Sequence, residues 1–274
     1  MSTWTLDDIP WSDFDPTKVN AEGLKVIKTA ALVERNGADY GLYLANVFEG
    51  DETFQQAARV WADEEEQHGL ALGRWAELAD PTFDFDAAFD TFKQLYRIPL
   101  EATQSVRGSR AAELCARCVV ETGTSSFYSA IRDAAHEPVL RAICKHIAAD
   151  EFRHYKLFAT HLSRYQAQEN LSTWQRLKVV VTRFRETSDD ELASAYHAGV
   201  GLEGPYNGSA ASSAYTARAL AFYQQKHVRR AGHMMSQAAG LSPHSLLTKL
   251  LSKVLWWGIS LKGRAFRNRV ASVA

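Results

Sequence analysis

Apolar and small residues recur at helical spacing through most of the chain, and short turn signals divide the pattern into long segments. Gly50, Asp80-Pro81 and Glu137-Pro138 are the clearest of these signals. The pattern predicts an all-α fold. We expect helices over residues 21–49, 51–79, 86–106, 109–135, 138–168, 172–187, 189–198 and 210–239, a Gly-rich loop at 199–209, and a last helix from Pro243.

The segments group into three regions. Residues 1–18 are rich in Trp and Asp and contain two prolines, so we expect an irregular arm that packs on the rest. Residues 19–168 hold four long helices, and residues 86–106 are the long crossover that traverses the height of a four-helix bundle. Residues 169–274 form a C-terminal helical extension packed on the bundle, and this extension is basic after residue 204.

The pattern Glu-x-x-His occurs twice, in the second and in the fourth long helix. Positions i and i+3 share a helix face, so each copy directs one carboxylate and one imidazole to the same point. A lone glutamate lies about thirty residues before each copy. The six residues are Glu34, Glu65, His68, Glu121, Glu151 and His154.

The turn signals lie where these pairs require them. Gly50 is midway between Glu34 and Glu65, and Asp51 follows as a helix cap. The midpoint of the other pair is His136, followed by Glu137 and then a proline suited to a first helical turn. Each residue of the set therefore lies about 15 residues, or roughly 22 Å, from its turn, inside the bundle.

The neighbours of these residues indicate burial. One Glu-x-x-His on its own is usually a solvated helix face, but here the same-face neighbours are small or apolar. Buried carboxylates need a compensating cation, and four carboxylates with two imidazoles are the ligand set of two iron or manganese ions in ferritin-like bundles. We predict two Fe ions, with a Mn/Fe centre as an open alternative. The residues expected to line an adjoining cavity are Ala30, Ala31, Gly37, Ala38, Trp61 and Cys118.

Two longer runs resemble the soluble acyl-ACP desaturases. Residues 143–154, Ile-Cys-Lys-His-Ile-Ala-Ala-Asp-Glu-Phe-Arg-His, resemble the fourth-helix signature of that family, and residues 61–69 resemble its Trp-x-x-Glu-Glu-x-x-His-Gly. Glu121-x-x-Thr124 resembles the ligand Glu that is followed one turn later by a Thr beside the iron site. The resemblance covers a little over half the chain. It departs at Gln67, where the family has Arg, and does not extend past about residue 168.

The resemblance implies a function and further site residues. The six Glu and His residues would be iron ligands, and Asp150 and Glu64 would accept the ring N–H bonds of His68 and His154 across the bundle. Thr124 would relay a proton to bound oxygen, or would bond a backbone carbonyl as helical Thr residues do. The implied activity is that of an O2-activating non-heme di-iron oxidoreductase that desaturates or hydroxylates an acyl chain or another apolar substrate.

Other members of the superfamily differ at single positions. A radical-bearing ribonucleotide reductase subunit has a Tyr where Leu72 stands, and arylamine N-oxygenases have a ligand His where Ile147 stands. A ferritin-like ferroxidase that handles iron without an organic substrate stays open. The sequence contains no flavin, heme or nicotinamide motif, so an oxidoreductase would need electrons from a separate ferredoxin or reductase. Cys115-x-x-Cys118 has no second pair, which favours core cysteines over a thiolate metal site.

Charge divides the chain unevenly. Residues 204–274 contain 10 Lys and Arg and no Asp or Glu, whereas all 32 acidic residues precede them. The last helix combines an apolar stripe with cations, which suits docking on the acidic bundle of the same chain, or on acyl carrier protein or an anionic membrane surface. We do not expect nucleic-acid binding. The stripe is Leu246, Leu247, Leu250, Leu251, Val254, Leu255 and Ile259, and the cations are Lys249, Lys253, Lys262, Arg264, Arg267 and Arg269.

Targeting signals are not evident. The start of the chain lacks a basic and then apolar run, and no apolar stretch reaches about 18 residues. We therefore expect a cytoplasmic location, with peripheral membrane association as a further possibility. We also expect a homodimer.

Overall fold

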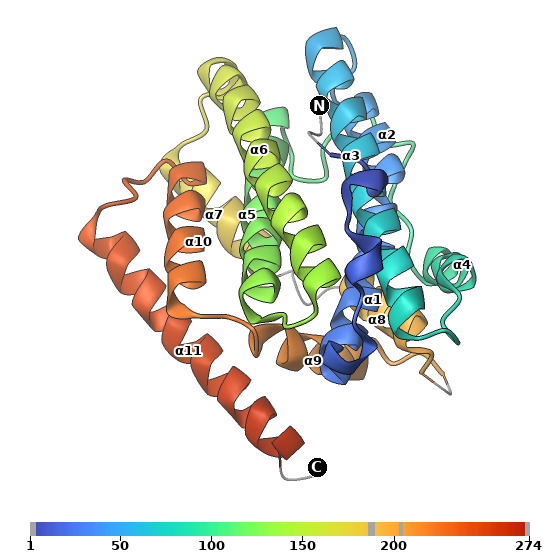
Figure 1. Ribbon diagram of the computed structural model, residues 1–274. Helices are drawn as coiled ribbons and strands as arrows, with labels where there is room; N and C mark the ends of the chain where they lie inside the picture. The colour runs from blue at the N-terminus through green and yellow to red at the C-terminus, as the bar shows by residue number, and fades with distance from the viewer. Residues whose placement is uncertain (1–3, 186–189, 203–204, 272–274) are drawn as a thin grey trace.

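The structure is a computed structural model that describes residues 4–185, 190–202 and 205–271. These residues fold into helices joined by turns and loops, and no β-strand forms among them (Figure 1). The predicted all-α fold class is confirmed.

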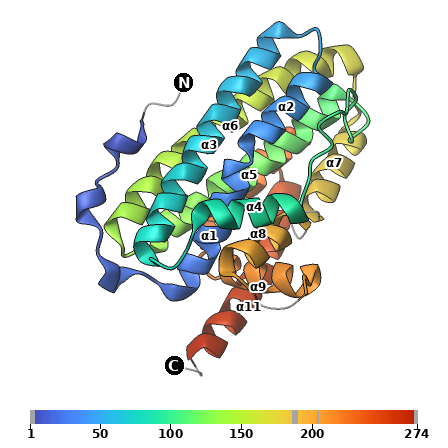
Figure 2. The same cartoon turned by 90° about the vertical axis from the view of Figure 1, so that its right-hand side faces the viewer.

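A helical bundle forms the body of the molecule. In Figure 2 its long helices run side by side along one direction. Two successive helices, α1 and α2, pack against α3, while α5 packs against α6, and α3 also contacts α6. The bundle helices are α1 (Ala21–Arg35), α2 (Gly37–Val47), α3 (Glu52–Ala79), α5 (Arg110–Ala134) and α6 (Pro138–Glu169).

The two turns predicted from the sequence are confirmed. Gly50 has φ +84°, a conformation that glycine adopts without steric cost, and the Asp51 carboxylate accepts a hydrogen bond from the backbone N–H of Phe54. At the other turn, the Glu137 carboxylate accepts from the N–H groups of Val139 and Leu140. These caps fix where α3 and α6 begin, and hence how far along each helix its Glu-x-x-His pair lies.

The helix predicted over residues 21–49 is wrong in one respect, because it is interrupted at Asn36. A side chain at Gly37 would place its Cβ 2.5 Å from Cβ of Glu65, so the close approach of α2 to α3 requires glycine at this position. Lys93 from the crossover donates a hydrogen bond to the Asn36 side chain across this break. Tertiary packing has overridden helix propensity here.

The crossover contains a shorter helix than residues 86–106. Helix α4 (Phe85–Leu95) ends before Ile98-Pro99, because the residue before a proline is disfavoured in the helical region. The following residues, up to the Ser109 cap of α5, are irregular. Helix α4 crosses the bundle axis in Figure 2 and packs on α8.

The C-terminal third is helical as well. Helices α7 and α10 pack on α5, α8 packs on α1, and α11 packs on α9 and α10. The single helix predicted over residues 210–239 is wrong, because Phe222 and Tyr223 turn inward against the core between two helices. Parts of the predicted loop at 199–209 and of the helix at 172–187, and the side chains of Leu247, Leu251 and Arg269, lie outside the described residues. The helices are α7 (Thr173–Arg185), α8 (Asp190–Val200), α9 (Gly208–Leu220), α10 (Gln225–Ala238) and α11 (Leu246–Ala271).

The N-terminal arm contains three short 3-10 turns, Leu6–Asp8, Trp11–Asp13 and Pro16–Lys18. It is tied to the bundle at both ends. Gln67 on α3 donates a hydrogen bond to the carbonyl of Trp4, and the backbone N–H of Asp15 donates to Glu137. The division into arm, bundle and extension stays a prediction. None of the described helices has the length and apolarity needed to cross a membrane.

Candidate metal centre

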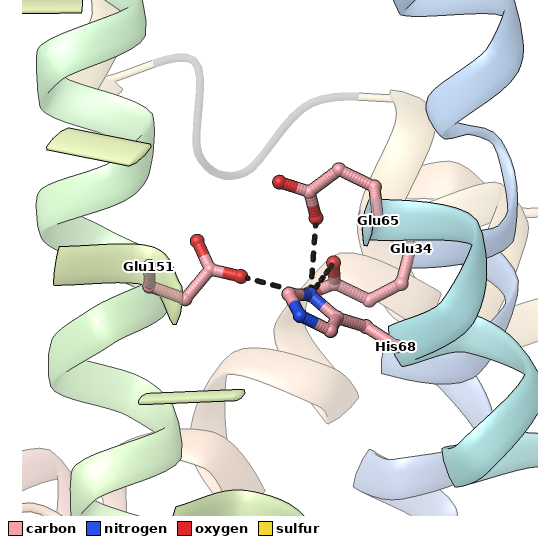
Figure 3. Close-up of side chains that lie close together, drawn as sticks. All are labelled: Glu34, Glu65, His68 and Glu151. Carbon is pink, nitrogen blue, oxygen red and sulfur yellow. Dashed lines mark ion pairs between the residues drawn. The ribbon is translucent and has the colours of Figure 1, made fainter. Parts of the chain in front are cut away.

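The six predicted side chains converge in the middle of the bundle, between two apolar core clusters. They form two groups, each with three carboxylates and one imidazole, whose potential ligand atoms all lie within 4.8 Å of one another. Figure 3 shows the first group, with Glu151 reaching from α6 towards His68 on the opposite helix. Glu34, Glu65, His68 and Glu151 form this group, and Glu65, Glu121, Glu151 and His154 form the second.

Glu65 and Glu151 belong to both groups and divide their oxygens between them. Nδ1 of His68 lies 3.5 Å from Oε2 of Glu65 and 3.3 Å from Oε1 of Glu151. Nδ1 of His154 lies 3.0 Å from Oε1 of Glu65 and 3.8 Å from Oε2 of Glu151. Each shared carboxylate therefore offers one oxygen to each group, which is the arrangement of two bridging ligands.

The remaining contacts complete each group symmetrically. Glu34 lies 3.7 Å from Nδ1 of His68, and Glu121 lies 3.7 Å from Nδ1 of His154. Ligands bonded to one ion at about 2.0–2.2 Å are separated from one another by roughly 3.0–3.6 Å. The separations observed here are close to that range.

The centre is buried and its inward-facing atoms lack protein partners. All six residues are at most 6% exposed. Nδ1 of both histidines, both oxygens of Glu121 and Oε1 of Glu151 have no hydrogen-bond partner among the described residues. Buried polar atoms without partners are costly, and a group of them that faces one point is satisfied by a cation. The donor set of carboxylate oxygens and imidazole nitrogens fits iron, manganese or zinc.

The electrostatics show how strongly the centre attracts positive charge. Burial, together with repulsion from Glu65, raises the pKa of Glu34 well above its usual value. Burial and repulsion from Glu151 do the same for the pKa of Glu121. Burial alone would lower the pKa of His68 and His154, but the nearby carboxylates favour the protonated rings and raise both pKa values well above the usual value. The buried centre therefore favours protonation of these four groups when no cation is bound.

The outward ring nitrogens are held by carboxylates, as the resemblance implied. Nε2 of His68 lies 3.2 Å from Asp150, and Nε2 of His154 lies 2.7 Å from Glu64, in each case across the bundle. Arg153 bridges these two acids, donating hydrogen bonds to both. A proton kept on Nε2 leaves the Nδ1 lone pair directed at the centre.

Thr124 lies beside the shared Glu151. Its hydroxyl is 2.6 Å from Oε2 of Glu151 and 3.3 Å from the backbone carbonyls of Val120 and Glu121. A hydroxyl donates one hydrogen bond at a time, and the shortest of these contacts is the one to the carboxylate. Both interpretations of Thr124 from the sequence therefore stay predictions.

A cavity of about 60 Å³ adjoins the centre. Trp61 and Gly37 contribute to its walls, as expected, and several polar residues contribute as well. Of the other residues expected there, Ala30 and Ala31 are packed in the core, Cys118 is packed in the second cluster, and Ala38 is exposed. The small side chains near Glu34 therefore allow close helix packing, and they do little to enlarge the cavity. The polar wall residues outside the six are Tyr40, Arg117, Thr124, Arg183 and Glu191.

Two contacts of the centre were missed by the sequence interpretation. The Tyr128 hydroxyl donates to Oε1 of Glu34 at 2.5 Å, and Nε1 of Trp4 donates to Oδ2 of Asp150 at 2.8 Å. Tyr128 lies two helical turns after Glu121, so helical spacing alone could have placed it on the same face. No local signal could have placed Trp4, because the path of the arm depends on long-range packing.

Comparisons with known proteins add no assignment. None of the protein-family models scanned matches the chain, and a search of curated proteins finds no significant match.

Proposed function

We propose that this protein is a ferritin-like dinuclear carboxylate oxidoreductase, holding two iron ions and using O2 as oxidant. The observation that carries the proposal is the pair of ligand groups that share Glu65 and Glu151. The resemblance to the soluble acyl-ACP desaturases over residues 61–69 and 143–154 supports the same class.

The residues around the centre have separate tasks in this proposal. Glu34 and His68 would hold one ion, Glu121 and His154 the other, and the shared carboxylates would bridge them. Bound iron would supply redox chemistry with O2. Asp150 and Glu64 keep the protons on Nε2, so the Nδ1 atoms stay available. The Thr124 hydroxyl donates a hydrogen bond to Oε2 of Glu151 over 2.6 Å, and would serve as a proton donor beside the centre.

The cavity limits the substrate. Pockets for organic ligands usually enclose about 300–1,000 Å³. The cavity of about 60 Å³ is far smaller, so it fits a compact molecule better than a long acyl chain. We therefore propose that the substrate is compact, and that electrons come from a separate ferredoxin or reductase.

Iron handling is a second candidate that the same cavity favours. Its walls include Glu191, an acid beyond the six. An additional carboxylate would assist iron that passes through as a substrate. A ferroxidase oxidises many Fe(II) equivalents per chain when O2 is present, whereas an oxidase that lacks its organic substrate oxidises about the two that it binds.

Metal stoichiometry tests the proposal directly. Protein loaded with Fe(II) without O2 should retain close to two iron ions per chain, as measured by elemental analysis after desalting. Glu121→Ala or His154→Ala should lose at least one ion, because each removes a ligand that only one group uses. His161→Ala is the matched control on the same helix, since His161 contacts Arg164 and Phe54 instead. Stoichiometric zinc that neither variant changes would refute the di-iron assignment.

A further inference from the structure

Helix α11 presents five large apolar side chains to solvent, whereas its inner face combines small residues with the half-buried Leu255 and Ile259. Its inner face carries Thr248 and Ser252, which are 1% and 8% exposed, and Gly263, which packs against the carbonyl of Leu220. A surface helix in water usually keeps a polar face towards solvent, so the exposed apolar row is unusual. The outward side chains, between 46% and 84% exposed, are Leu246, Leu250, Val254, Trp257 and Leu261.

These five residues form one continuous stripe. Their spacing of four, four, three and four positions keeps them on one face of the helix. The stripe runs over roughly 22 Å of helix length. In Figure 1, α11 lies at the outer edge of the molecule beyond α10, so no other described helix covers this face.

Cations border the stripe. Lys249, Lys253 and Arg267 lie along one edge and Lys262 along the other, all of them exposed. No described ion pair joins these residues, or Arg264, to a carboxylate. The segment from residue 204 onward contains no acidic residue that could pair with them.

Charge distinguishes between the surfaces that could bind the apolar stripe of α11. Helix α11 packs on α9 and α10, which belong to the same acid-free segment, so it does not dock on the acidic part of its own chain. A second copy of α11 would bring cations against cations. An exposed apolar row bordered by cations matches a surface that is anionic outside and apolar inside.

We propose that α11 is a membrane-surface helix that binds bilayers containing anionic phospholipids. The apolar stripe enters the boundary between headgroups and acyl chains, with the Trp257 ring at headgroup level, and the bordering cations contact phosphate and carboxylate groups. The helix lies in the plane of the surface and does not cross the bilayer. This proposal does not depend on the chemistry of the metal centre.

Vesicle binding by the full chain tests the proposal. The protein should co-sediment with vesicles of phosphatidylcholine and phosphatidylserine and much less with phosphatidylcholine alone. Replacing Lys249, Lys253, Lys262 and Arg264 with Gln should weaken binding about 10- to 100-fold at low salt. Raising the ionic strength from about 0.1 M to about 1 M should reduce the difference, because the screening length falls from about 10 Å to about 3 Å.

A matched charge control uses exposed cations of the acidic region. The variant with Arg59, Arg141, Lys145 and Lys156 changed to Gln loses the same charge from α3 and α6 and should bind vesicles like the parent. Equal binding to neutral and anionic vesicles, or equal losses in both charge variants, would overturn the proposal.

The apolar stripe is tested separately. Changing Leu250, Trp257 and Leu261 to Ser should reduce vesicle binding at least tenfold without lowering the Tm, because these side chains are exposed in the folded protein. Leu42→Ser with Leu78→Ser is the control on other exposed leucines. A dimer that dissociates in the stripe variant would assign the face to a second copy, and a lower Tm would assign it to packing within the chain. Either result would overturn the membrane proposal, whatever the iron content.

Discussion

At the scale of single residues, the chemistry of the candidate metal centre depends on which of its buried acids and imidazoles are protonated. Four carboxylates and two imidazoles are buried together, and the pKa values of Glu34, Glu121, His68 and His154 are all raised well above their usual values. The raised pKa values favour the protonated form of these four groups, and bound protons offset negative charge in the centre. Divalent metal ions would bring positive charge to the same atoms, so metal ions and protons would compete for them.

Metal binding should therefore release protons. Titrating Fe(II) or Co(II) into the metal-free protein at pH 7 should release up to about four protons per chain when both positions fill. Because the relevant pKa values are raised, apparent affinity should increase as the pH rises towards them, and proton release should fall once they are exceeded. Calorimetry in buffers of different ionisation enthalpy measures the release. His154→Ala should release fewer protons, and binding without any release would contradict the raised pKa values.

At the scale of elements, the position of the centre depends on how closely helices approach. A Cβ at Gly37 would lie 2.5 Å from Cβ of Glu65, and a Cβ at Gly41 would lie 2.6 Å from Cβ of Ala62. These two glycines let α2 lie directly on α3. The break at Asn36 thus helps to position Glu34 and Glu65 side by side.

Gly37→Ala should separate α2 from α3 and displace Glu65. We expect a loss of stability of about 1–3 kcal/mol, as for overpacked cores, together with weaker metal retention. Gly123→Ala is the matched control, because a Cβ there meets nothing within 4 Å and Ala favours the helix by about 0.5–1 kcal/mol. Thermal melts and iron content measure both effects. A Gly37→Ala protein as stable as the parent would show that the helices can adjust at no cost.

Local signals made part of this fold predictable. The Gly50 turn and the Glu137 cap depend on their immediate neighbours. Their positions determine how far along the bundle the six Glu and His residues lie. The break at Asn36 and the turn before Gln225 could not be predicted, since both arise from contacts with distant segments. The size of the cavity was also unpredictable, because small residues near Glu34 are compatible with either open space or close packing.

At the scale of the whole molecule, Asp133 joins the bundle to the C-terminal helices. This residue of α5 accepts hydrogen bonds from Lys226 and His227 at the start of α10. Burial would raise its pKa, but these hydrogen bonds and that of Arg132 outweigh burial and hold the pKa well below its usual value. The acidic and the basic parts of the chain are therefore linked at this point by an ionised carboxylate.

Acid should weaken this link. Because the folded pKa of Asp133 is depressed, its contribution to stability is complete above about pH 4, the unfolded value, and declines as the pH falls towards the folded value. Asp133→Asn should cost about 1 kcal/mol, or roughly 2–4 °C in Tm, at pH 7. The difference between parent and variant should shrink below about pH 4, as followed by thermal melts. A difference that is constant with pH would mean that the carboxylate charge contributes nothing.

The bond between Trp4 and Asp150 has a consequence for the order in which the protein is assembled. These residues are 146 positions apart, so the arm is synthesised long before its partner on α6 exists. At a translation rate of about 5–20 residues per second, Asp150 follows Trp4 by roughly 7–30 s. The earliest described residue of the chain is therefore among the last to reach its place. The contact of Trp4 with Asp150, beside His68, forms only after most of the bundle has folded. The reason is that contacts over such sequence separations form slowly compared with local helices.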